Sequence, residues 1–590
     1  MGHIPLNVVN FARDGRRTVR IPVPSSGLNL REDWQSNDSS KGVMMKNLVC
    51  DNRGVKSRGS FEKISSSTDE ILTFHNITSR PFCERTIIHA GTKILCFCND
   101  DSSLTVLYEG VPDKDSMFCE FTSKLYLYCD TYVFSIDRNL VCVEEYPEAP
   151  LVVEDVNQGV GDSGDTVKGY DVNLIAPRVA VKYTPCSASK FALPYACDTS
   201  RKIRAFYGKT ELEINISKTT STTVYITKDV DNKAVTIEYY LANPEEIGYD
   251  SLFNGCTCCV GYGGSDVSGT RIFAGGNVQR PGEYCKSELI NPLYFKKSDI
   301  QKLGDGCDII TGFAKMNDNL MIFTDRSLYR MSYELSDAGG FFSTCQISSN
   351  IGCDIPKSIQ LVENKIVFAN TELGVHMVCY TDRVREMNIV PLSGNVNGGK
   401  YGISGCDKEM LKKGTSLDFG GKYYFCADGK VYICDYGRCG FSSSSSYDNS
   451  QGKLVWYMWE GMENEVLFSM GDELYCVTST DSTVKKYTDK AFCDESSFVT
   501  ERYDFDSPFV KKTVKGIQLD VEMSKGAEMI VTIYGDGKPV YSQSIYSSGD
   551  GRMCIDINLP HISLYRLSYG LCMQNGFFEL NSAAVKAVFN

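Results

Sequence analysis

The sequence predicts an all-β fold: a β-propeller with a small inserted β domain and a C-terminal β-sandwich. The first of three supporting observations is a sequence pattern in which a hydrophobic strand, a short polar or Gly/Asp turn and a second hydrophobic strand follow one another. This pattern is typical of β-hairpins. It recurs about six times, at Ile87–Cys98, Phe121–Ile136, Asn319–Met331, Asn364–Cys379, Lys422–Cys434 and Asn464–Val477. From Leu320 onward the copies start roughly 40 to 60 residues apart, the spacing of four-stranded propeller blades. The other two observations are that helical periodicity is almost absent and that the pattern of the predicted strands changes near the C-terminus.

Changes in composition and in the pattern of predicted strands divide the chain into five expected regions. Residues 1–70 are predicted to be an N-terminal extended segment with a first strand, in which Gly42–Leu48 forms one or two helical turns. Propeller blades are expected over 71–150 and 251–490, with a linker and an inserted β domain over 151–250. The linker is indicated by the Gly- and Asp-rich run Gly159–Gly169. The inserted domain is indicated by short strands at Arg178–Tyr183, Glu211–Ile216, Thr222–Ile226 and Ala234–Tyr240.

The last region, 491–590, is predicted to be the β-sandwich. Ile517, Leu519, Val521 and Met523 alternate with polar residues, which is the period of a half-buried antiparallel strand. The strand that follows runs into Gly535–Pro539, a strong hairpin turn. The serine run Phe441–Tyr447, in the second blade region, is predicted to be an exposed loop.

Composition and charge narrow the possible functions. The net charge of −13 argues against a general affinity for nucleic acid, whose phosphates need Lys and Arg, yet an acidic wall lets DNA pass without sticking. Neither a signal peptide nor a membrane-spanning segment is expected, because no apolar run is long enough. The 25 cysteines are dispersed, many of them within predicted strands, so we expect reduced structural thiols and folding in a cytoplasm.

The search for catalytic groups predicts no catalytic, cofactor-binding or metal-binding residue, and therefore no enzyme. The five histidines, His3, His75, His89, His376 and His561, belong to no metal or nucleophile motif. The dense cysteine group Cys256, Cys258 and Cys259 is either a metal site or, as we favour, a set of structural thiols. The glycine run of Gly261, Gly263 and Gly264 lacks the helix that a phosphate loop needs, which favours a loop at a blade edge.

For two further groups of residues, both a functional and a structural interpretation stay open. Asp325, Asp428 and Asp472 are candidates for a glycosidase carboxylate pair, although their place in Gly/Asp turns favours turn chemistry. Trp456, Tyr457 and Trp459 would suit a sugar subsite, but large residues before a hairpin are more typical of blade core.

Four segments read together resemble a known group of proteins. They are GLNLREDW (Gly27–Trp34), MKNLVCDNRGVKSRGSFEKI (Met45–Ile64), the block Thr270–Phe295 and the block Leu303–Met331. In this order they resemble tailed-bacteriophage virion proteins related to the tail nozzle and DNA-stabilisation proteins of short-tailed phages. The resemblance covers about 20–150 and 250–480 in organisation, and its motifs match only in the quoted blocks.

The resemblance implies a structural protein of the phage tail or head-to-tail assembly, part of the virion and assembled in the host bacterial cytoplasm. It implies a nozzle-like or hub-like ring, hexameric by analogy, that forms part of the DNA ejection conduit. The implied partners are other copies of the chain, portal, adaptor or tail proteins, tail fibres, and genomic DNA that crosses the lumen without sequence-specific binding. Two alternatives stay open: a receptor-binding or glycan-degrading tail propeller, and a cellular interaction propeller of the WD or kelch type.

Overall fold

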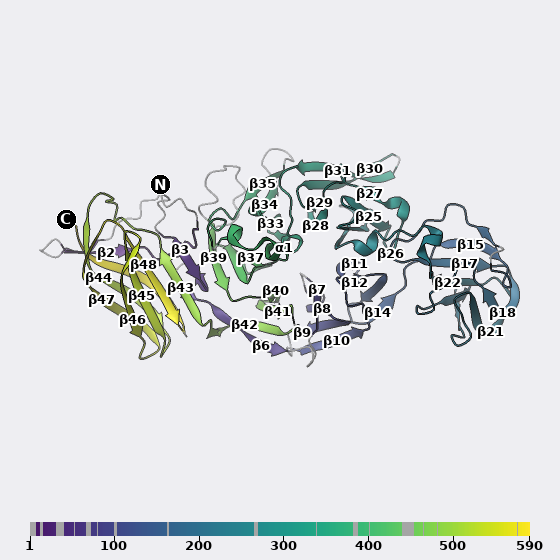
Figure 1. Cartoon of the computed structure of the whole chain (residues 1–590), viewed down its shortest axis with the longest axis horizontal. Coiled ribbons are helices and arrows are strands. Elements are labelled where there is room, and N and C mark those ends of the chain that lie inside the picture. Colours follow the sequence, from purple (N-terminus) through teal and green to yellow (C-terminus); the bar gives the residue numbers. More distant parts are fainter. Residues whose placement is uncertain are drawn as a thin grey trace. The chain divides into compact units, whose positions relative to one another are not determined.

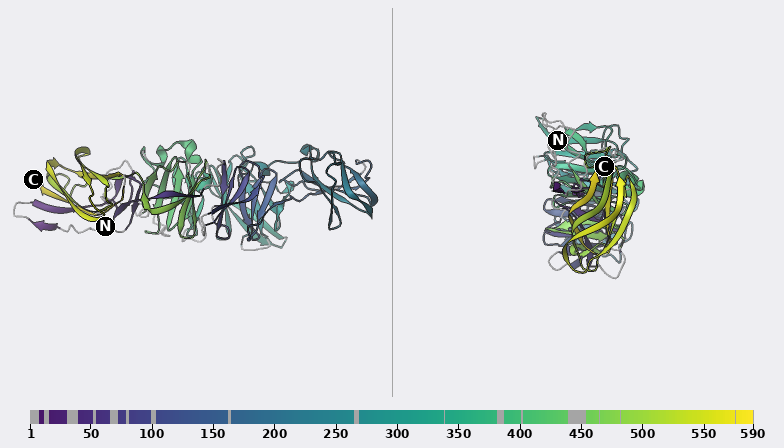
Figure 2. Two further views of the ribbon diagram at one scale, coloured as in Figure 1. Left: turned by 90° about the horizontal axis from the view of Figure 1, so that it is seen from below. Right: turned by 90° about the vertical axis from the view of Figure 1, so that its left-hand side faces the viewer.

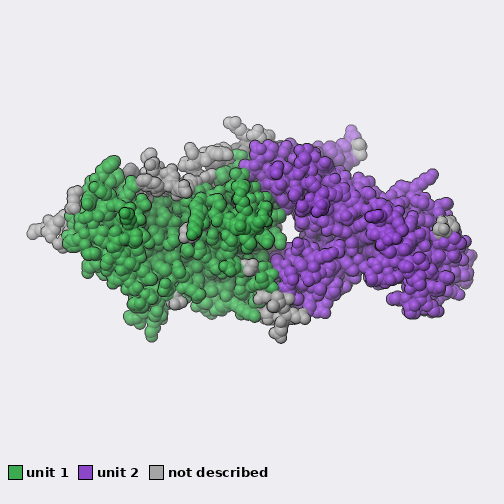
Figure 3. Space-filling view, in the orientation of Figure 1, with its two compact units in different colours: residues 1–71, 354–590 green, residues 72–353 purple. Residues whose placement is uncertain are grey.

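The chain is almost entirely β, as predicted: strands make up 59% of it and helices 4%. The computed structural model (Figure 1) describes residues 8–11, 16–30, 40–51, 54–65, 72–78, 81–98, 103–161, 164–264, 269–337, 339–380, 387–400, 402–438, 454–463, 465–480, 482–574 and 576–589. They form two compact units, unit 1 (1–71 and 354–590) and unit 2 (72–353), coloured green and purple in Figure 3. Among the described helices, which include α1 (Lys408–Lys412), none has the length and hydrophobicity needed to cross a membrane.

Unit 2 contains four antiparallel sheets, each built by consecutive strands, which we call meander sheets. The first two are β7–β10 (Phe74–Ile77, Arg85–Ala90, Lys93–Cys98, Ser103–Glu109) and β11–β14 (Met117–Phe121, Lys124–Cys129, Tyr132–Ile136, Cys142–Glu145). The third is β23–β27 (Cys258–Tyr262, Arg271–Gly275, Glu283–Glu288, Asn291–Phe295, Gln301–Lys302). The fourth is β28–β31 (Ile310–Met316, Asn319–Thr324, Leu328–Ser336, Gly339–Ser348).

Unit 1 contains three more meander sheets in its described part. Two are β32–β35 (Gln360–Val362, Lys365–Asn370, Gly374–Tyr380, Met387–Pro391) and β36–β39 (Thr415–Phe419, Lys422–Ala427, Lys430–Asp435, Val455–Glu460). The third joins β40–β42 (Glu465–Met470, Glu473–Thr478, Val484–Phe492) to β6 (Gly59–Ser65). Its fourth strand therefore comes from the other end of the chain.

Successive meander sheets pack face to face within each unit. The first strands β7, β11, β23 and β28 are neighbours in that order in unit 2, and β32, β36 and β40 are neighbours in unit 1. Separate apolar clusters fill the spaces between sheets of unit 2, for example Ile87 with Leu127 and Phe273 with Ile322. All six predicted hairpins are confirmed, because each coincides with two consecutive strands of one meander sheet.

The sheet β23–β27 was not among the predicted hairpins. Its strands β24 and β25 are joined by seven residues, from Gly276 to Gly282, rather than by a short turn. Both of these glycines have positive φ, at 93° and 69°, and turn the chain beside the strands. The hairpin pattern missed this pair of strands because their connection is longer than a short turn.

The insert, residues 151–247, has a β structure of its own between the second and third meander sheets. Its larger sheet runs in the order β16-β15-β17-β22-β19-β20, and β18 and β21 form a second, two-stranded sheet. The strands are β15 (Leu151–Val156), β16 (Asp165–Thr166), β17 (Arg178–Tyr183), β18 (Cys186–Ala192), β19 (Arg204–Tyr207), β20 (Thr210–Leu212), β21 (Thr223–Lys233) and β22 (Thr236–Tyr240). One apolar cluster, which includes Val181, Phe191 and Tyr239, forms its core.

The C-terminal residues build two sheets with a shared core, which we call the C-terminal sheet pair (Figure 2). One has the order β1-β2-β49-β44-β47 with β4 and β5 attached, and the other has the order β3-β43-β48-β45-β46. Their strands are β1 (Val8–Phe11), β2 (Arg16–Ile21), β3 (Gly42–Lys46), β4 (Leu48–Cys50), β5 (Val55–Ser57), β43 (Glu495–Thr500), β44 (Lys512–Met523), β45 (Glu528–Gly535), β46 (Lys538–Tyr546), β47 (Gly551–Leu564), β48 (Leu567–Gln574) and β49 (Phe578–Phe589).

The alternation predicted for the C-terminal region is present. Ile517, Leu519, Val521 and Met523 of β44 are all buried, whereas the residues between them are more exposed. The turn from β45 to β46 has Asp536 at φ 50° and Gly537 at φ 89°, left-handed positions that Asp and Gly tolerate. The predicted hairpin turn is therefore confirmed.

The N-terminal region differs from its prediction. The sequence predicts one strand and a helical turn at Gly42–Leu48, but the described residues contain six strands, and β3 occupies Gly42–Lys46. The helix prediction was wrong because this stretch pairs with β43, where Met44 opposes Val499 and Met45 opposes Phe498. The loop prediction for Phe441–Tyr447 lies outside the described residues.

Candidate functional site

Two of the five histidines come together in unit 2. The ring centroids of His75 on β7 and His89 on β8 lie 4.8 Å apart. His75 Nε2 lies 2.6 Å from Asp113 and its Nδ1 lies 3.6 Å from Asp115. His89 Nδ1 lies 2.9 Å from Ser116 Oγ, and its Nε2 is buried without a hydrogen-bond partner. No sequence pattern indicates this cluster, because its members meet only through the register of the sheet and the return of the loop before β11.

The histidine cluster has the groups of a nucleophilic site but not the required geometry. Burial, followed by the charge of His75, lowers the pKa of His89 to about 4. Ser116 is 8% exposed and His89 is 0% exposed, so a substrate does not reach the Ser116 hydroxyl. In nucleophilic sites the second nitrogen of the activating histidine is usually oriented by a partner, and His89 Nε2 has none. The cluster braces the loop 113–116 on the first meander sheet.

The dense cysteine group lies among other buried thiols. Cys259 on β23 contacts Cys119 on β11, and Cys256, in the turn before β23, contacts Cys285 on β25. The interaction with Cys119, and then burial, raises the pKa of Cys259, and burial raises the pKa of Cys258. A thiol with a raised pKa carries little of the thiolate that metals bind. In the described part of the chain, no group of three or more His, Cys, Asp or Glu side chains is placed to hold a metal ion.

The glycine run lies at the end of β23 and in the loop after it, where it meets three different neighbours. A Cβ on Gly261 would lie 3.0 Å from the ring of Phe121, and one on Gly263 would lie 2.5 Å from Thr270 N. Gly264 and the nearby Gly269 instead face Tyr333 of the next sheet. A Cβ on Gly269 would lie 2.9 Å from the ring of Tyr333, and one on Gly264, whose φ is +65°, would lie 3.1 Å from Tyr333 Cβ. Gly340 likewise faces the Tyr333 hydroxyl. Real Cβ atoms do not approach so closely, so these glycines allow β30 and its hairpin to pack beside β23.

The three acidic turn candidates lie in hairpin turns, and one has a carboxylate neighbour. Asp325 follows β29, Asp428 lies between β37 and β38, and Asp472 lies between β40 and β41. Burial, and in the same direction the charge of Asp308, raises the pKa of Asp325. Asp325 accepts a hydrogen bond from Ile309 N, and Asp308 accepts one from Ser327 Oγ, so both carboxylates hold turns in place.

The aromatic group on β39 is buried in unit 1. Trp456, Tyr457 and Trp459 are exposed by 2% or less. Trp459 Nε1 donates to Leu48 O of β4, and Trp456 Nε1 donates to Leu392 O. The predicted blade-core interpretation fits these contacts, and a sugar does not reach the rings.

A groove of about 630 Å³ opens in the insert, between the residues just before β19 and the segment that begins in β20 and continues after it. It is lined by Thr199, Ser200, Arg201, Lys202, Ile203, Glu211, Leu212, Glu213, Ile214, Ile216 and Thr219. Arg204 binds both carboxylate oxygens of Glu211 at 2.9 Å and so lowers the pKa of that group. A glycosidase acid needs a raised pKa, so Glu211 is suited to binding rather than to proton donation.

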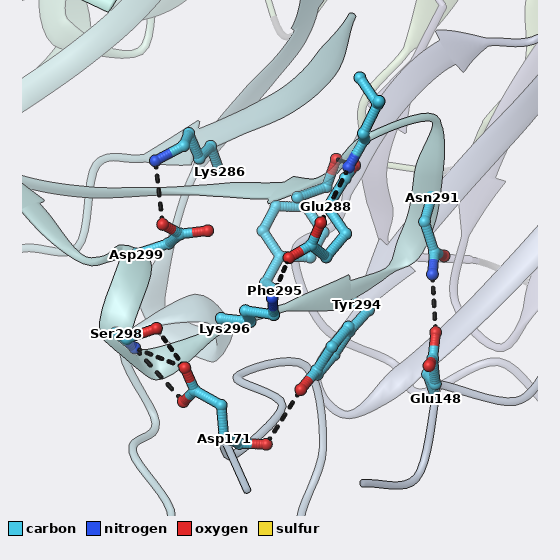
Figure 4. Close-up of polar contacts among 12 residues, drawn as sticks. Glu148, Asp171, Lys286, Glu288, Asn291, Tyr294, Phe295, Lys296, Ser298 and Asp299 are labelled. Carbon is cyan, nitrogen blue, oxygen red and sulfur yellow. Dashed lines mark hydrogen bonds and ion pairs between the residues drawn. The ribbon is translucent and has the colours of Figure 1, made fainter. Parts of the chain in front are cut away.

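A polar seam fastens the insert to the third meander sheet (Figure 4). Asp171 accepts hydrogen bonds from Ser298, and Asn291 donates to Glu148 at 2.7 Å. Buried Asn173 makes four hydrogen bonds: its amide donates to Glu148 O and Leu293 O, and its oxygen accepts from Ile175 N and Phe295 N. An apolar cluster that contains Leu174 and Phe295 continues the attachment. These contacts join the insert to this sheet.

Comparison of the sequence with family models and with curated proteins assigns no function, so the function is argued from the geometry of the chain. No protein-family model matches the sequence, and no curated protein matches it significantly.

Proposed function

We propose that this protein is a structural component of a phage tail or head-to-tail assembly, a nozzle-like or hub-like ring that forms part of the DNA ejection conduit and a platform for other tail proteins. The observation that carries the proposal is the order of parts along the chain. Two meander sheets, an insert, five more meander sheets and the C-terminal sheet pair follow one another. The virion proteins that the sequence resembles have this order of propeller, inserted β domain and β-sandwich.

In this proposal the meander sheets of each unit are propeller blades. Face-to-face packing of consecutive sheets, with their first strands adjacent, supports this arrangement in each unit. Further support comes from β6, because completing the last blade with a strand from the N-terminal region ties the two ends of a propeller together. The C-terminal sheet pair is then the β-sandwich of the family.

The contacts of the candidate groups among the described residues also suit a structural protein that carries out no reaction. The candidate groups serve packing: His89 braces a loop, the glycines seat Tyr333, and the tryptophans fill a core. The charge of −13 suits a conduit wall that repels DNA rather than retaining it. Hexameric assembly is part of the proposal by analogy with the family.

Cryo-electron microscopy of the virus particle that contains this chain tests the proposal. We expect six copies around the tail axis below the portal, with the chain absent from other parts of the particle. Density for this chain at the tips of fibres, or outside any particle, would contradict the tail-ring function.

The groove in the insert favours a second candidate, a receptor-binding tail protein. A volume of about 630 Å³ lies in the range of small-ligand sites, and hydroxyl and charged side chains line it. Binding of the purified chain to host surface polysaccharide, compared with a Lys202→Glu variant, tests this function. Saturable binding that the variant loses would support it, and release of reducing sugar would point to glycan degradation instead.

A further inference from the structure

We propose that Cys119 and Cys259 form a disulfide that links the second and third meander sheets when the protein meets an oxidising environment. The two residues lie on β11 and β23, the first strands of sheets that are neighbours in unit 2. Their thiols are in contact, although the residues are about 140 positions apart in the sequence. The inference goes beyond the proposed tail function and does not depend on it.

Two further contacts fix how β11 and β23 face each other. Cys259 Sγ lies 3.6 Å from the backbone oxygen of Phe118, the residue before Cys119. Two positions further along β23, a Cβ on Gly261 would lie 3.0 Å from the ring of Phe121, which is two positions after Cys119. Side chains alternate between the two faces of a strand, so residues two positions apart share a face. The two contacts therefore place Cys259 beside Cys119 on the facing sides of their strands.

The two strands also approach each other closely at this point. Gly261 has no side chain, and the same Cβ position would lie 3.7 Å from Glu120 O of β11. Cys119 belongs to the apolar cluster that the second and third sheets share, and Cys259 packs against that cluster. A disulfide forms without backbone movement only where the two Cα atoms lie within about 7 Å. The close approach and the contact between the thiols suit a cross-link between these strands.

The adjacent Cys258 lies on the opposite face of β23. It packs against the apolar cluster between the third and fourth sheets, which includes Phe273 and Ile322. Its Sγ lies 3.3 Å from Gly275 O of β24. Cys258 has the same chemistry as Cys259 and the same strand, but it faces away from β11, so it provides a matched control for the proposed pair.

The reaction is thiol–disulfide exchange with a small-molecule disulfide such as oxidised glutathione. The thiolate of Cys259, which is more exposed than Cys119, attacks the glutathione disulfide, whose S–S bond breaks as one glutathione leaves. The Cys119 thiolate then attacks Cys259 Sγ and releases the second glutathione. The two cysteine protons pass to the two released thiolates, and the two electrons reduce the glutathione disulfide. Because contact with Cys119 and then burial raise the pKa of Cys259, the reaction should become faster as the pH rises.

The bond closes a long loop of chain that contains the whole insert, residues 151–247. Cross-linking the ends of such a loop removes conformational freedom from the unfolded chain. It also joins directly two sheets that the chain connects only through the insert. The thiols stay reduced in a cytoplasm, where disulfides are rare, and the bond forms after the protein leaves it.

The test compares the full-length wild type with Cys119→Ser, Cys259→Ser and the control Cys258→Ser. Each chain, checked for folding by circular dichroism, is incubated at low concentration with oxidised glutathione, and the remaining thiols are blocked with iodoacetamide. Trypsin releases Cys119 in the peptide 115–124 and Cys259 in the peptide 234–271, so mass spectrometry without reduction identifies the link. Hydrogen exchange before and after oxidation measures the effect of the link on β11 and β23.

We expect the wild type and Cys258→Ser to give the two peptides joined, with exchange at β11 and β23 at least tenfold slower after oxidation. Neither Cys119→Ser nor Cys259→Ser should show the link or the slower exchange. A Cys119 that is still alkylated in the oxidised wild type would overturn the proposal, and so would a link that persists in Cys259→Ser. A link between the two peptides without slower exchange would overturn the conclusion that the bond braces the two sheets.

Discussion

The C-terminal sheet pair and the insert are both β modules attached to meander sheets, but they are attached differently. In unit 1 a single apolar cluster runs from the meander sheets into the sheet pair, and it contains Tyr424, Trp459, Leu519 and Met529. In unit 2 the insert keeps its own core, separate from the cluster that anchors it to the third meander sheet. Its attachment combines that cluster with the polar seam around Asn173.

This difference predicts different responses to damage. A shared core makes the parts of unit 1 lose stability together, because removing one side chain leaves a cavity that both parts line. A module with its own core loosens at its attachment while its interior stays folded. We therefore expect unit 1 to unfold cooperatively and the insert to behave as a separable unit.

The largest effect is expected from Trp459→Ala in the shared core. Trp459 stacks on Tyr487 with 5.7 Å between ring centroids, and Arg58 lies 5.3 Å above its ring. Loss of a buried tryptophan costs about 3–5 kcal/mol. Hydrogen exchange should become faster in both β36–β39 and β44–β49, and Trp459→Phe should retain most of the protection. Faster exchange confined to β39 would contradict a shared core.

Asn173→Ala should loosen the insert without unfolding it. The variant removes four hydrogen bonds to the backbone, at a cost of about 2–3 kcal/mol. Leu293 O keeps its other hydrogen bond, from Glu148 N. We expect faster exchange at 171–176 and 293–297, with the insert core around Tyr239 still protected. Asn215→Ala, in a loop of the insert far from the seam in sequence, is the control. Loss of protection at Tyr239 would show that the insert depends on its attachment.

Acid should weaken the first meander sheet through His89. The pKa of His89 falls from an ordinary 6.5 to about 4, so the folded state binds fewer protons than the unfolded state between these values. Stability is complete above pH 6.5 and declines as the pH falls toward 4, by about 2 kcal/mol between pH 7.5 and 5. Exchange at β8 and β9 should report this decline. His89→Gln should flatten the pH dependence, and an unchanged slope would contradict the assignment to His89.

The smallest effect is expected from Arg204→Ala at the rim of the groove. Arg204 and Glu211 are partly exposed, with side-chain exposures of 24% and 44%, so their ion pair contributes about 0.5 kcal/mol or less. Denaturant unfolding should barely change, whereas the pKa of Glu211, measured by NMR, should rise toward its ordinary value. A large loss of stability would mean that the groove is part of the insert core.

Much of the fold followed from local sequence patterns. The hairpin at Lys422–Cys434 and the alternation at Ile517–Met523 depend on neighbours within about 15 residues, and these predictions were confirmed. The same local signals missed β24–β25, where the connection is long, and assigned a helix to β3, whose partner β43 lies some 450 residues away in the sequence. The His75–His89 cluster was also beyond prediction, since nothing in the spacing of the two residues indicates that their rings meet.

The sequence by itself determined that the chain is built of β-hairpins, because side-chain alternation and turn residues are local properties. Only the tertiary structure decided which strands complete which sheets. Strand β6 pairs with β42, and β2 pairs with β49, across almost the whole length of the chain. Such pairings depend on which edges and apolar faces remain uncovered after the local hairpins have formed, and that information belongs to the assembled core rather than to any one segment.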